Sequence, residues 1–409
     1  MPVASVKPRT EPAGETPRRI GRHKMETIRI FDTKPYLTEC SAEVLSCTET
    51  EHEGNKCYAV ILDRTVFFPE EGGQSPDKGT INEAEVLDVQ VKDRFITHYL
   101  AEPVALGTAS LKLFWPHRFS NMQQHSGEHI FSGLVHSIFG YDNVGFHLSD
   151  NSVTMDFNGI LTQEDVVLIE DRVNEAIYKN IEIDARYVDR ETLKHLEYRS
   201  KKELSGDVRI VTIPGYDICA CCAPHVKRTG EIGILKVIRL QNYKGGVRIH
   251  ILCGSRALSY YRESIGLIDE LTDILTTGRE NLVESVQSLS AEALALSSKL
   301  LSAKTELMNR ELLEIPESHQ DVLLFREKTD NIIIRNAVNF LTARHQGVVA
   351  FFAGDDTCGY SYIIGSATKD VRSVQKKLSE KLGARGGGRP EMVQGSVKAV
   401  KKEIEEALG

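Results

Sequence analysis

The sequence contains no apolar run long enough to span a membrane, so no membrane partner is expected. Its first residues also lack the apolar core of a secretion signal. Positive charge is not in excess, because the formal net charge is −8 at pH 7. This balance argues against bulk, non-specific binding to nucleic acid, although it is compatible with a local basic face.

Cysteine is scarce and unevenly placed, with eight residues in 409 and three of them between positions 219 and 222. This distribution does not suit a disulfide framework, and it favours a metal site in a protein of the reducing cytoplasm. Residues 1–24 are rich in proline, arginine, lysine and small residues. We expect them to form a disordered extension before a working start at Met25.

The length exceeds that of one ordinary core, and the pattern predicts an α+β protein of several domains. Closely spaced strand signals with glycine-rich turns predict a small β-barrel over residues 25–114. Helices and strands are predicted over residues 115–256. Leucines seven apart, with apolar companions four residues later, predict a coiled coil or helical arm over residues 257–318, with a helix packed on its own domain as the alternative. Residues 319–409 are predicted to form an α/β domain.

Two histidines, His125 and His129, lie four residues apart in a predicted helix. This spacing puts their Cβ atoms about 5–6 Å apart on one face, so both imidazoles can bind one metal ion. Cys221 and His225 have the same spacing farther along the chain. Because thiolate and imidazole together suit zinc better than magnesium or calcium, we predict one Zn²⁺ per chain held by these four residues.

Two other interpretations of these segments stay open. Cys219 and Cys222 have the spacing of a chelating pair in a structural zinc knuckle. The run from His125 to His129, with Glu128 between them, matches the inverted zinc-peptidase motif, in which the glutamate activates water. That function needs a carboxylate as third ligand and leaves Cys221 and its histidine partner without a role. A zinc peptidase is therefore the alternative function.

Glycine and arginine gather near the C-terminus, in residues 383–390. The glycines expose backbone N–H groups and permit positive φ, which suits contact with phosphate, and the arginines add bidentate donors. Lysines shortly before this segment give the region a basic face. We predict phosphate or nucleic-acid binding here, with a merely flexible loop as the alternative. The predicted contacts are Lys376, Lys377, Arg385, Gly386, Gly387, Gly388 and Arg389.

Four motifs together resemble those of alanyl-tRNA synthetase editing domains and of the free-standing AlaX editing proteins. HSGEH resembles their His-x-x-x-His motif, and CCAPHVKRTGEIGILKV resembles their Cys-x-x-x-His motif. LDRTVFFPEEGGQSPDKG is similar to the glycine-rich motif of their N-terminal barrel, and LGARGGGRPEMVQG to the DHH-associated domain of the synthetase. The motifs come in the family's order from about residue 26 to the end. Nothing resembles the aminoacylation domain, so the sequence resembles the long form of AlaX.

The resemblance implies a trans-acting hydrolase that cleaves the ester between a wrong amino acid and tRNA for alanine. Serine is the chief candidate and glycine the second. It implies zinc ligands at His125, His129, Cys221 and His225, editing in residues 115–256, and tRNA binding by the C-terminal domain. A non-catalytic tRNA-binding protein with structural zinc is a further alternative. A homodimer through the helical arm or the C-terminal domain is compatible with the pattern.

The sequence departs from the family pattern at Ser126, where threonine is usual, and at residues 222–224, where Gly-Gly-Thr is more common. A polar side chain near the metal must read the serine hydroxyl. His147 is our candidate, and Gln74 can approach from the barrel, with a core or surface role as the alternative for both. Glu128 is a candidate base, but its position about 100° from His129 around the helix favours an exposed side chain.

Four protein ligands would close a tetrahedral zinc shell. Hydrolysis at such a site requires that one ligand be loose, that the shell expand, or that zinc only position the substrate while another group activates water. The sequence leaves these three possibilities open.

Overall fold

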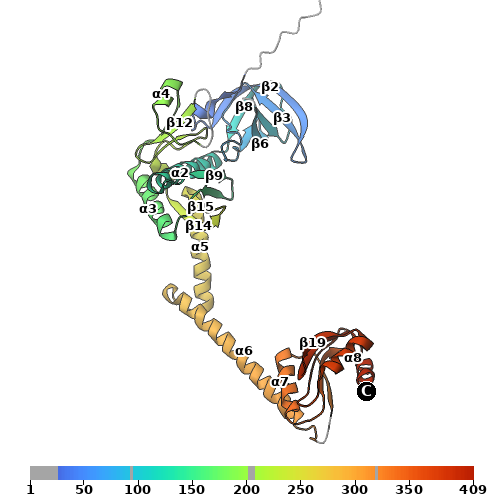
Figure 1. The fold of residues 1–409 in the computed structure, drawn as a ribbon. Coiled ribbons are helices and arrows are strands. Elements are labelled where there is room, and N and C mark those ends of the chain that lie inside the picture. Colours follow the sequence, from blue (N-terminus) through green and yellow to red (C-terminus); the bar gives the residue numbers. More distant parts are fainter. Residues whose placement is uncertain (1–25, 93–94, 201–207, 318–320) are drawn as a thin grey trace, which may run out of the picture. The chain divides into compact units, whose positions relative to one another are not determined.

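The computed structural model describes residues 26–92, 95–200, 208–317 and 321–409. The expected disordered extension over residues 1–24 and the working start at Met25 lie outside this part of the chain. Two units are formed, Met1–Leu267 and Ile268–Gly409 (Figure 1). Both combine helices with β-sheets, as the α+β prediction requires. Among the described residues, no helix is both long enough and apolar enough to cross a membrane.

Six antiparallel strands near the start of the first unit pair in the order β2-β3-β7-β6-β5-β8, and β8 returns to β2. Alternating residues of β8, from Ala109 to Leu113, are buried inside this ring. The strands are β2 (Glu39–His52), β3 (Asn55–Leu62), β5 (Gly79–Ile81), β6 (Ala84–Lys92), β7 (Phe95–Leu100) and β8 (Gly107–Leu113). Before and between them lie β1 (Ile28–Arg29), α1 (Ile30–Thr33) and β4 (Arg64–Thr65), with β1 parallel to β4.

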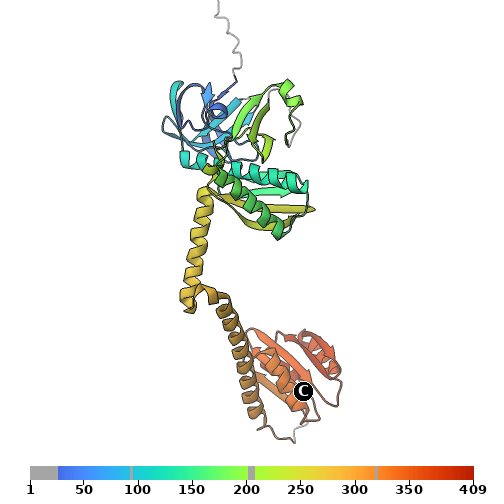
Figure 2. The same cartoon turned by 90° about the vertical axis from the view of Figure 1, so that its left-hand side faces the viewer.

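Helix α2 (Trp115–Phe139) follows the ring and is buried along most of its length. Pro116 lies in the first turn of this helix, a position that tolerates proline. Gly140 caps its C-terminus in the left-handed conformation, with a φ of 70°. Helix α3 (Gln163–Lys179) begins at a capping box formed by Thr162 and Asp165 and packs against α2 (Figure 2). A sheet of order β14-β15-β10-β9 contributes to the same core. Its strands are β9 (Asn143–Leu148), β10 (Val153–Phe157), β14 (Leu235–Tyr243) and β15 (Gly246–Cys253).

A second, three-stranded sheet of the first unit has the antiparallel order β11-β12-β13. Its strands are β11 (Asp184–Val188), β12 (Val208–Ile213) and β13 (Asp217–Ala220), with the short helix α4 (Arg190–Lys194) after β11. From β13 the chain passes directly through residues 221–225 to the 3₁₀ turn η1 (Thr229–Ile232). Helix α2 contacts both β13 and η1. The segment with Cys219, Cys221 and Cys222 therefore lies beside α2.

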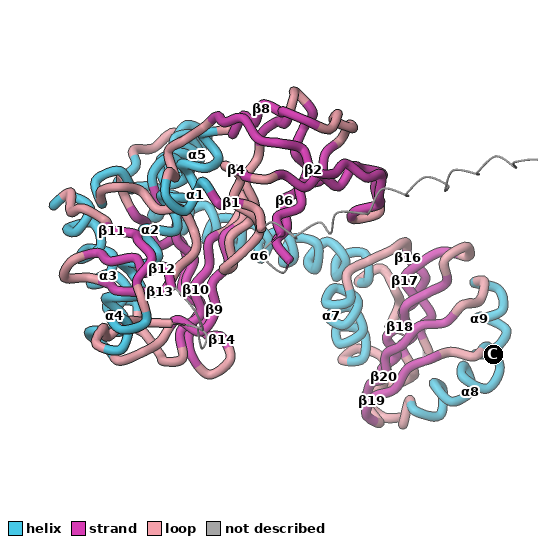
Figure 3. Tube along the Cα trace, turned by 90° about the horizontal axis from the view of Figure 1, so that it is seen from above, coloured by secondary structure: helices cyan, strands magenta, loops and turns pink. Residues whose placement is uncertain are grey.

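Helix α5 (Gly254–Leu275) begins in the first unit, and η2 (Arg279–Asn281) and α6 (Leu282–Leu312) belong to the second. The second unit contains a five-stranded sheet of order β16-β17-β18-β20-β19. Helix α7 packs on one face of this sheet and helices α8 and α9 on the other (Figure 3). The elements are β16 (Val322–Arg326), α7 (Asn331–Thr342), β17 (Val349–Asp355), β18 (Gly359–Gly365), α8 (Arg372–Leu382), β19 (Arg385–Arg389), β20 (Met392–Val397) and α9 (Lys401–Leu408).

A buried ion pair fixes the start of α2 against the strand ring. The side chains of Arg118 and Asp77 are fully buried, and the Arg118 Nε lies 3.0 Å from both Asp77 carboxylate oxygens. The remaining guanidinium donors reach the carbonyl oxygens of Pro35, at 2.9 Å, and Val66, at 2.7 Å. Because the charge is paired and its donors have acceptors, burial is tolerated, and loss of one partner would leave a buried charge uncompensated.

Removing the acceptor of this pair is expected to destabilise the first unit. Asp77→Ala leaves the Arg118 guanidinium buried without its counter-charge, which should lower the free energy of unfolding by about 3–5 kcal/mol. Denaturant titration followed by the fluorescence of Trp115, the only tryptophan of the chain, measures this loss. As a control, Glu49→Ala breaks the exposed pair with Lys56 and should cost at most about 1 kcal/mol. Equal losses in the two variants would contradict the prediction.

Candidate metal centre

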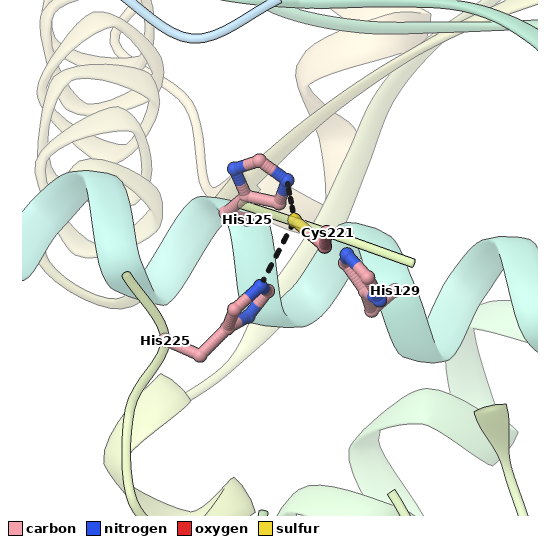
Figure 4. A group of neighbouring side chains, drawn as sticks. All are labelled: His125, His129, Cys221 and His225. Carbon is pink, nitrogen blue, oxygen red and sulfur yellow. Dashed lines mark hydrogen bonds between the residues drawn. The ribbon is translucent and has the colours of Figure 1, made fainter. Parts of the chain in front are cut away.

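Four side chains from two distant segments meet in the first unit (Figure 4). His125 and His129 come from α2, and Cys221 and His225 come from the segment that follows β13. One donor atom from each residue lies within 4.8 Å of all the others. The three histidines are buried and the cysteine is half-buried. The structure thus brings together the four residues that the sequence singled out as metal ligands.

The distances within this cluster fit a tetrahedral zinc shell. Sγ of Cys221 lies 3.5 Å from Nε2 of His125 and 3.4 Å from Nε2 of His225 (Figure 4). Zinc bonds of about 2.3 Å to sulfur and 2.0–2.1 Å to nitrogen, at tetrahedral angles, separate the two donors by about 3.5–3.6 Å. The separations of Cys221 from His125 and from His225 therefore match those between two ligands of one zinc ion.

The Nδ1 atom of each imidazole has a partner, which leaves Nε2 for the centre. His125 Nδ1–H donates to Oε1 of Gln74 at 2.7 Å, from the glycine-rich loop of the strand ring. Nδ1 of His225 lies 3.0 Å from Oγ of Ser126, which also accepts the backbone N–H of Val226 at 3.2 Å. Such partners fix both the tautomer and the orientation of a metal-binding imidazole.

The third imidazole is held by an ion pair. His129 Nδ1–H donates to Oδ2 of Asp217 at 2.8 Å, and Arg199 donates to both oxygens of the same carboxylate, at 2.7 and 3.0 Å. Burial acts to raise the pKa of Asp217, but the bonds from His129 and Arg199 outweigh it and lower this pKa. Asp217 is therefore an ionised partner of His129 at neutral pH.

The charges in the cluster shift the pKa values of Cys221, His225 and His129 in different directions. Burial acts to raise the pKa of Cys221, but the neighbouring His125, His129 and His225 lower it well below its ordinary value. Burial, and then the charge of His129, lower the pKa of His225 to about 3. Burial acts to lower the pKa of His129, whereas Asp217 and Cys221 raise it well above its ordinary value. The negative groups around His129 provide the charge balance that a cation requires.

The other two cysteines of the cluster have different surroundings. Burial raises the pKa of Cys219 to about 11, and it raises the pKa of Cys222 well above its ordinary value. Among the described residues, Cys221 is the cysteine whose sulfur is grouped with the donor atoms of all three histidines. Cys219 does lie near His129 and Asp217, but that carboxylate is engaged by Arg199. The geometry supports Cys221, rather than a knuckle of the other two, as the sulfur ligand.

Glu128 is buried, contrary to the exposed position expected from its place on the helix. The helix-face argument was wrong because α2 is enclosed on nearly all sides and has no solvent face at this turn. Oε1 of Glu128 accepts bonds from Ser132 Oγ at 2.7 Å and from Asn143 Nδ2 at 2.6 Å. Oε2 lies 3.9 Å from Nε2 of His129. The carboxylate is therefore held beside the candidate metal centre.

Four residues that support the cluster were not predicted from the sequence: Ser132, Asn143, Asp217 and Arg199. Ser132 follows Glu128 by four residues, so its contact was readable from helical spacing. Asn143 comes just after the glycine that ends α2, which marks a loop but not a direction. The contacts of Asp217 and Arg199 depend on the pairing of β13 with its neighbours, for which one sequence carries no local signal.

A cavity of about 620 Å³ opens at the cluster. The metal-ligand candidates His125, His129 and Cys221 line it together with Glu128. Gly72 and Gly73 also line it, and both have positive φ. A Cβ at Gly73 would lie 2.4 Å from the backbone oxygen of Phe146, so this turn needs glycine to pack against β9. The glycine-rich loop therefore forms part of the wall.

Gln74 and His147, the two residues predicted to recognise the serine hydroxyl, lie in different places. Gln74 is buried behind His125, whose Nδ1 it holds, and it is not among the residues that line the cavity. His147 is exposed on β9, opposite Thr154 of β10, and it is also not among the lining residues. The structure thus brings Gln74 to the cluster as a support, and it does not bring His147 there.

The glycine–arginine segment of the second unit is the edge strand β19, not an open loop. All five of its residues are exposed. Arg385 and Arg389 pair with Ser396 and Met392 of β20, and Met392 packs in the core that α7 covers, so both arginines face that side. Cβ atoms at Gly386 and Gly388 would collide with the backbone of β20, at 2.4 and 2.3 Å, whereas Gly387 has open space. Lys376 and Lys377 belong to α8, on the other side of the sheet.

Removing the support of His125 is expected to weaken metal binding without removing a ligand. Gln74→Leu deletes the acceptor for Nδ1–H, so we expect the affinity for Zn²⁺ to fall by about 10–100-fold. Competition with a chromophoric chelator measures this affinity. Gln90→Leu, on the outer part of the strand ring, is the matched control and should bind as the parent does. The same affinity in both variants would contradict the assigned role.

Comparison with known proteins places this geometry in a family context. Models for three domains match: the threonyl and alanyl tRNA synthetase second additional domain over residues 208–250, tRNA synthetases class II (A) over residues 21–108, and the DHHA1 domain over residues 319–409. The alanyl-tRNA editing protein Aarsd1 of Rattus norvegicus is 26% identical over 388 residues, which cover 90% of this chain and 94% of that protein.

Two further relatives are informative. The alanyl-tRNA editing protein AlaX-L of Pyrococcus horikoshii is 26% identical over 410 residues, which cover 92% of this chain and 96% of that protein. The alanine–tRNA ligase of Ignicoccus hospitalis is 27% identical over 379 residues, or 89% of this chain but only 40% of the ligase. Together with the order of its four motifs, these matches show that the chain is a homologue of the AlaX-type alanyl-tRNA editing proteins.

Proposed function

We propose that this protein is a trans-acting hydrolase that removes wrongly attached serine, and as a second substrate glycine, from tRNA for alanine at a centre holding one Zn²⁺ per chain. The observation that carries this proposal is the convergence of three supported imidazoles and a thiolate on one point of a cavity, beside a buried carboxylate. The names of its homologues, alanyl-tRNA editing proteins, support the substrate.

Zinc bound by His125, His129, Cys221 and His225 would supply a Lewis acid that positions and polarises the ester carbonyl. The protein contributes the orientation of these ligands through Gln74, Ser126 and Asp217. Because the cluster is buried, the charges inside it interact more strongly than they would in water. The four-donor set also supports the deacylase over a zinc peptidase, since the available carboxylate, Asp217, is engaged by His129 and Arg199.

Glu128 is our proposed general base. Ser132 and Asn143 hold its Oε1, and its Oε2 lies 3.9 Å from Nε2 of His129 in the wall of the cavity, where water and ester would meet. A positioned carboxylate of this kind contributes about 10²–10⁴-fold to the rate. Its presence supports the third of the possibilities left open by a closed zinc shell, in which the metal positions the ester and another group takes the proton from water.

Discrimination between serine and alanine needs a polar group that the serine hydroxyl can pair with. His147 remains the prediction made from the sequence, and its exposed place on β9 requires a substrate that reaches beyond the cavity. Ser126, which stands where the family usually has threonine, contacts the candidate ligand His225. Its effect on the cavity wall would therefore pass through the position of His225.

We propose these roles for the predicted domains: a β-barrel in residues 25–114, editing in residues 115–256, a helical arm in residues 257–318 and tRNA binding in residues 319–409. We also propose a cytoplasmic location, because aminoacyl-tRNA is used there in translation. A homodimer through the arm is supported by exposed leucines along α6. They are Leu289, Leu296, Leu300 and Leu307, each more than half exposed.

The decisive test is hydrolysis of matched substrates. Zinc-loaded protein is incubated with seryl-, glycyl- and alanyl-tRNA for alanine, and release of the amino acid is measured. We expect seryl-tRNA to be hydrolysed fastest and alanyl-tRNA to be spared. Cys221→Ala should abolish hydrolysis of every substrate, because the ligand acts on the shared ester, while Cys358→Ala, an exposed cysteine of the second unit, should act as the parent does. Failure of the parent protein to hydrolyse any of the three would refute the proposal.

The second unit is expected to contribute to the affinity for tRNA without taking part in the hydrolysis. Arg385→Ala combined with Arg389→Ala removes two phosphate contacts, which should weaken tRNA binding and reduce the log–log salt slope by about 1.4–1.8. Fluorescence anisotropy with labelled tRNA at several salt concentrations measures both quantities. The matched control replaces Arg172 and Arg186, two exposed arginines of the first unit. An unchanged slope in the first variant would remove β19 from the interface.

A further inference from the structure

A row of three residues crosses the β11-β12-β13 sheet and ends at the candidate metal centre. Tyr187 of β11 pairs directly with Arg209 of β12, and the backbone oxygen of Arg209 accepts the N–H of Cys221 at 3.0 Å. Residues directly opposite each other in an antiparallel pair point to the same face. Because neighbouring strands lie about 4.7–4.9 Å apart, the backbones of Tyr187 and Cys221 are separated by about 9–10 Å.

The side chain of Tyr187 is anchored at its hydroxyl and is half-exposed. It is 50% exposed, and it lines the same cavity as His125, His129 and Cys221. Its hydroxyl donates to Oδ2 of Asp32, a buried residue of α1, at 2.7 Å. Burial, and then this bond, raise the pKa of Tyr187, so the hydroxyl remains a donor at neutral pH. The result is a flat aromatic surface whose orientation is already set before any ligand binds.

Arg209 fixes the spacing between this ring and the cluster. Its Nη1 donates to the backbone oxygens of Cys221 and Ala223, at 2.9 Å each, and the residue is buried. The guanidinium therefore ties the cysteine-bearing turn to β12, which pairs in turn with β11. Phe146, another aromatic residue of the cavity wall, has its ring 4.8 Å from that of His125 and so lies at the metal end. Tyr187 presents its ring at a different part of the wall, two strands from Cys221.

An aminoacyl-tRNA ends in an unpaired adenosine whose ribose carries both the ester and the base. When the ester lies at the metal centre, the adenine must lie less than one nanometre away, and unpaired bases bind to proteins by stacking on aromatic side chains. A cavity of about 620 Å³ is within the usual range for a ligand of this size. We propose that Tyr187 is the stacking surface for the terminal adenine. This inference rests on the proposed function.

The test compares a substrate that has the base with one that lacks it. Tyr187→Leu keeps an apolar side chain but removes the aromatic face, and Tyr187→Phe keeps the face but removes the bond to Asp32. We expect Tyr187→Leu to raise KM for seryl-tRNA about 5–150-fold, the range for one lost stacked base, with a much smaller effect on kcat. Tyr187→Phe should keep a KM for seryl-tRNA close to that of the parent protein. For seryl ethyl ester, which has no base, the leucine variant should show no comparable rise in KM.

The control is Tyr178→Leu, an equally drastic change at a tyrosine of α3 that is 74% exposed. Metal content and circular dichroism verify that each variant is folded. Equal losses of Tyr187→Leu on seryl-tRNA and on the ethyl ester, or no loss on either, would overturn the proposal, as would failure of Tyr187→Phe to restore binding.

A binding measurement separates this inference from the proposed function. Isothermal titration uses an adenosine analogue with serine joined to the 3′ carbon through an amide, which is not hydrolysed. If the parent protein binds the analogue, and Tyr187→Leu binds it about 5–150-fold more weakly, the stacking surface is supported even should hydrolysis of seryl-tRNA fail. Equal binding of the analogue by both proteins would refute the role of Tyr187, whatever the outcome of the hydrolysis test.

Discussion

The candidate site depends on hydrogen bonds at the Nδ1 atoms of its imidazoles. Gln74 from the strand ring, Asp217 from β13 and Ser126 from α2 each occupy the Nδ1 side of one histidine. Without these partners the rings could rotate or exchange tautomers, and the Nε2 atoms would no longer converge on the cysteine. The loop that carries Gln74 also carries Asp77, whose ion pair with Arg118 seats α2 against the ring. One short loop thus determines both the position of the helix and the orientation of a ligand on it.

Local spacing was sufficient to predict the four ligand candidates, because each pair lies within five residues of sequence. It was not sufficient for their supports, since Asp217 and Arg199 reach His129 only through strand pairing between distant segments. The error at Glu128 has a related cause: a helical wheel assigns faces relative to solvent, and α2 is enclosed on nearly all sides. At β19 the glycines were read as a phosphate-binding loop, but two of them are needed because a Cβ would strike the neighbouring strand.

Helix α2 is unusual in burying many polar side chains, and this follows from its place between the strand ring and the two sheets of the first unit. Several of these side chains are paired: Gln124 bonds to both backbone groups of Cys253, at 2.8 and 2.6 Å, and Nε2 of Gln123 donates to the backbone oxygen of Glu231 at 2.9 Å. Buried polar groups that are satisfied in this way specify one arrangement, because any shift of the helix would leave several of them unpaired. The helix is thereby a rigid base for His125 and His129.

Two rigid features of the same sheet, a metal-binding turn and an anchored aromatic ring, would let the protein recognise a linkage rather than an amino acid. Free serine has neither the ester nor the adenine, so it would engage only the groups that read its hydroxyl. A correctly charged alanyl-tRNA has both, so the ester and the base cannot by themselves protect it. Under the proposed function, selectivity against alanine would come from a polar group that pairs with the serine hydroxyl and that alanine leaves unpaired. With the tasks separated in this way, the ligand candidates and the aromatic ring would serve every substrate, and the group that reads the amino-acid side chain would decide which one is hydrolysed.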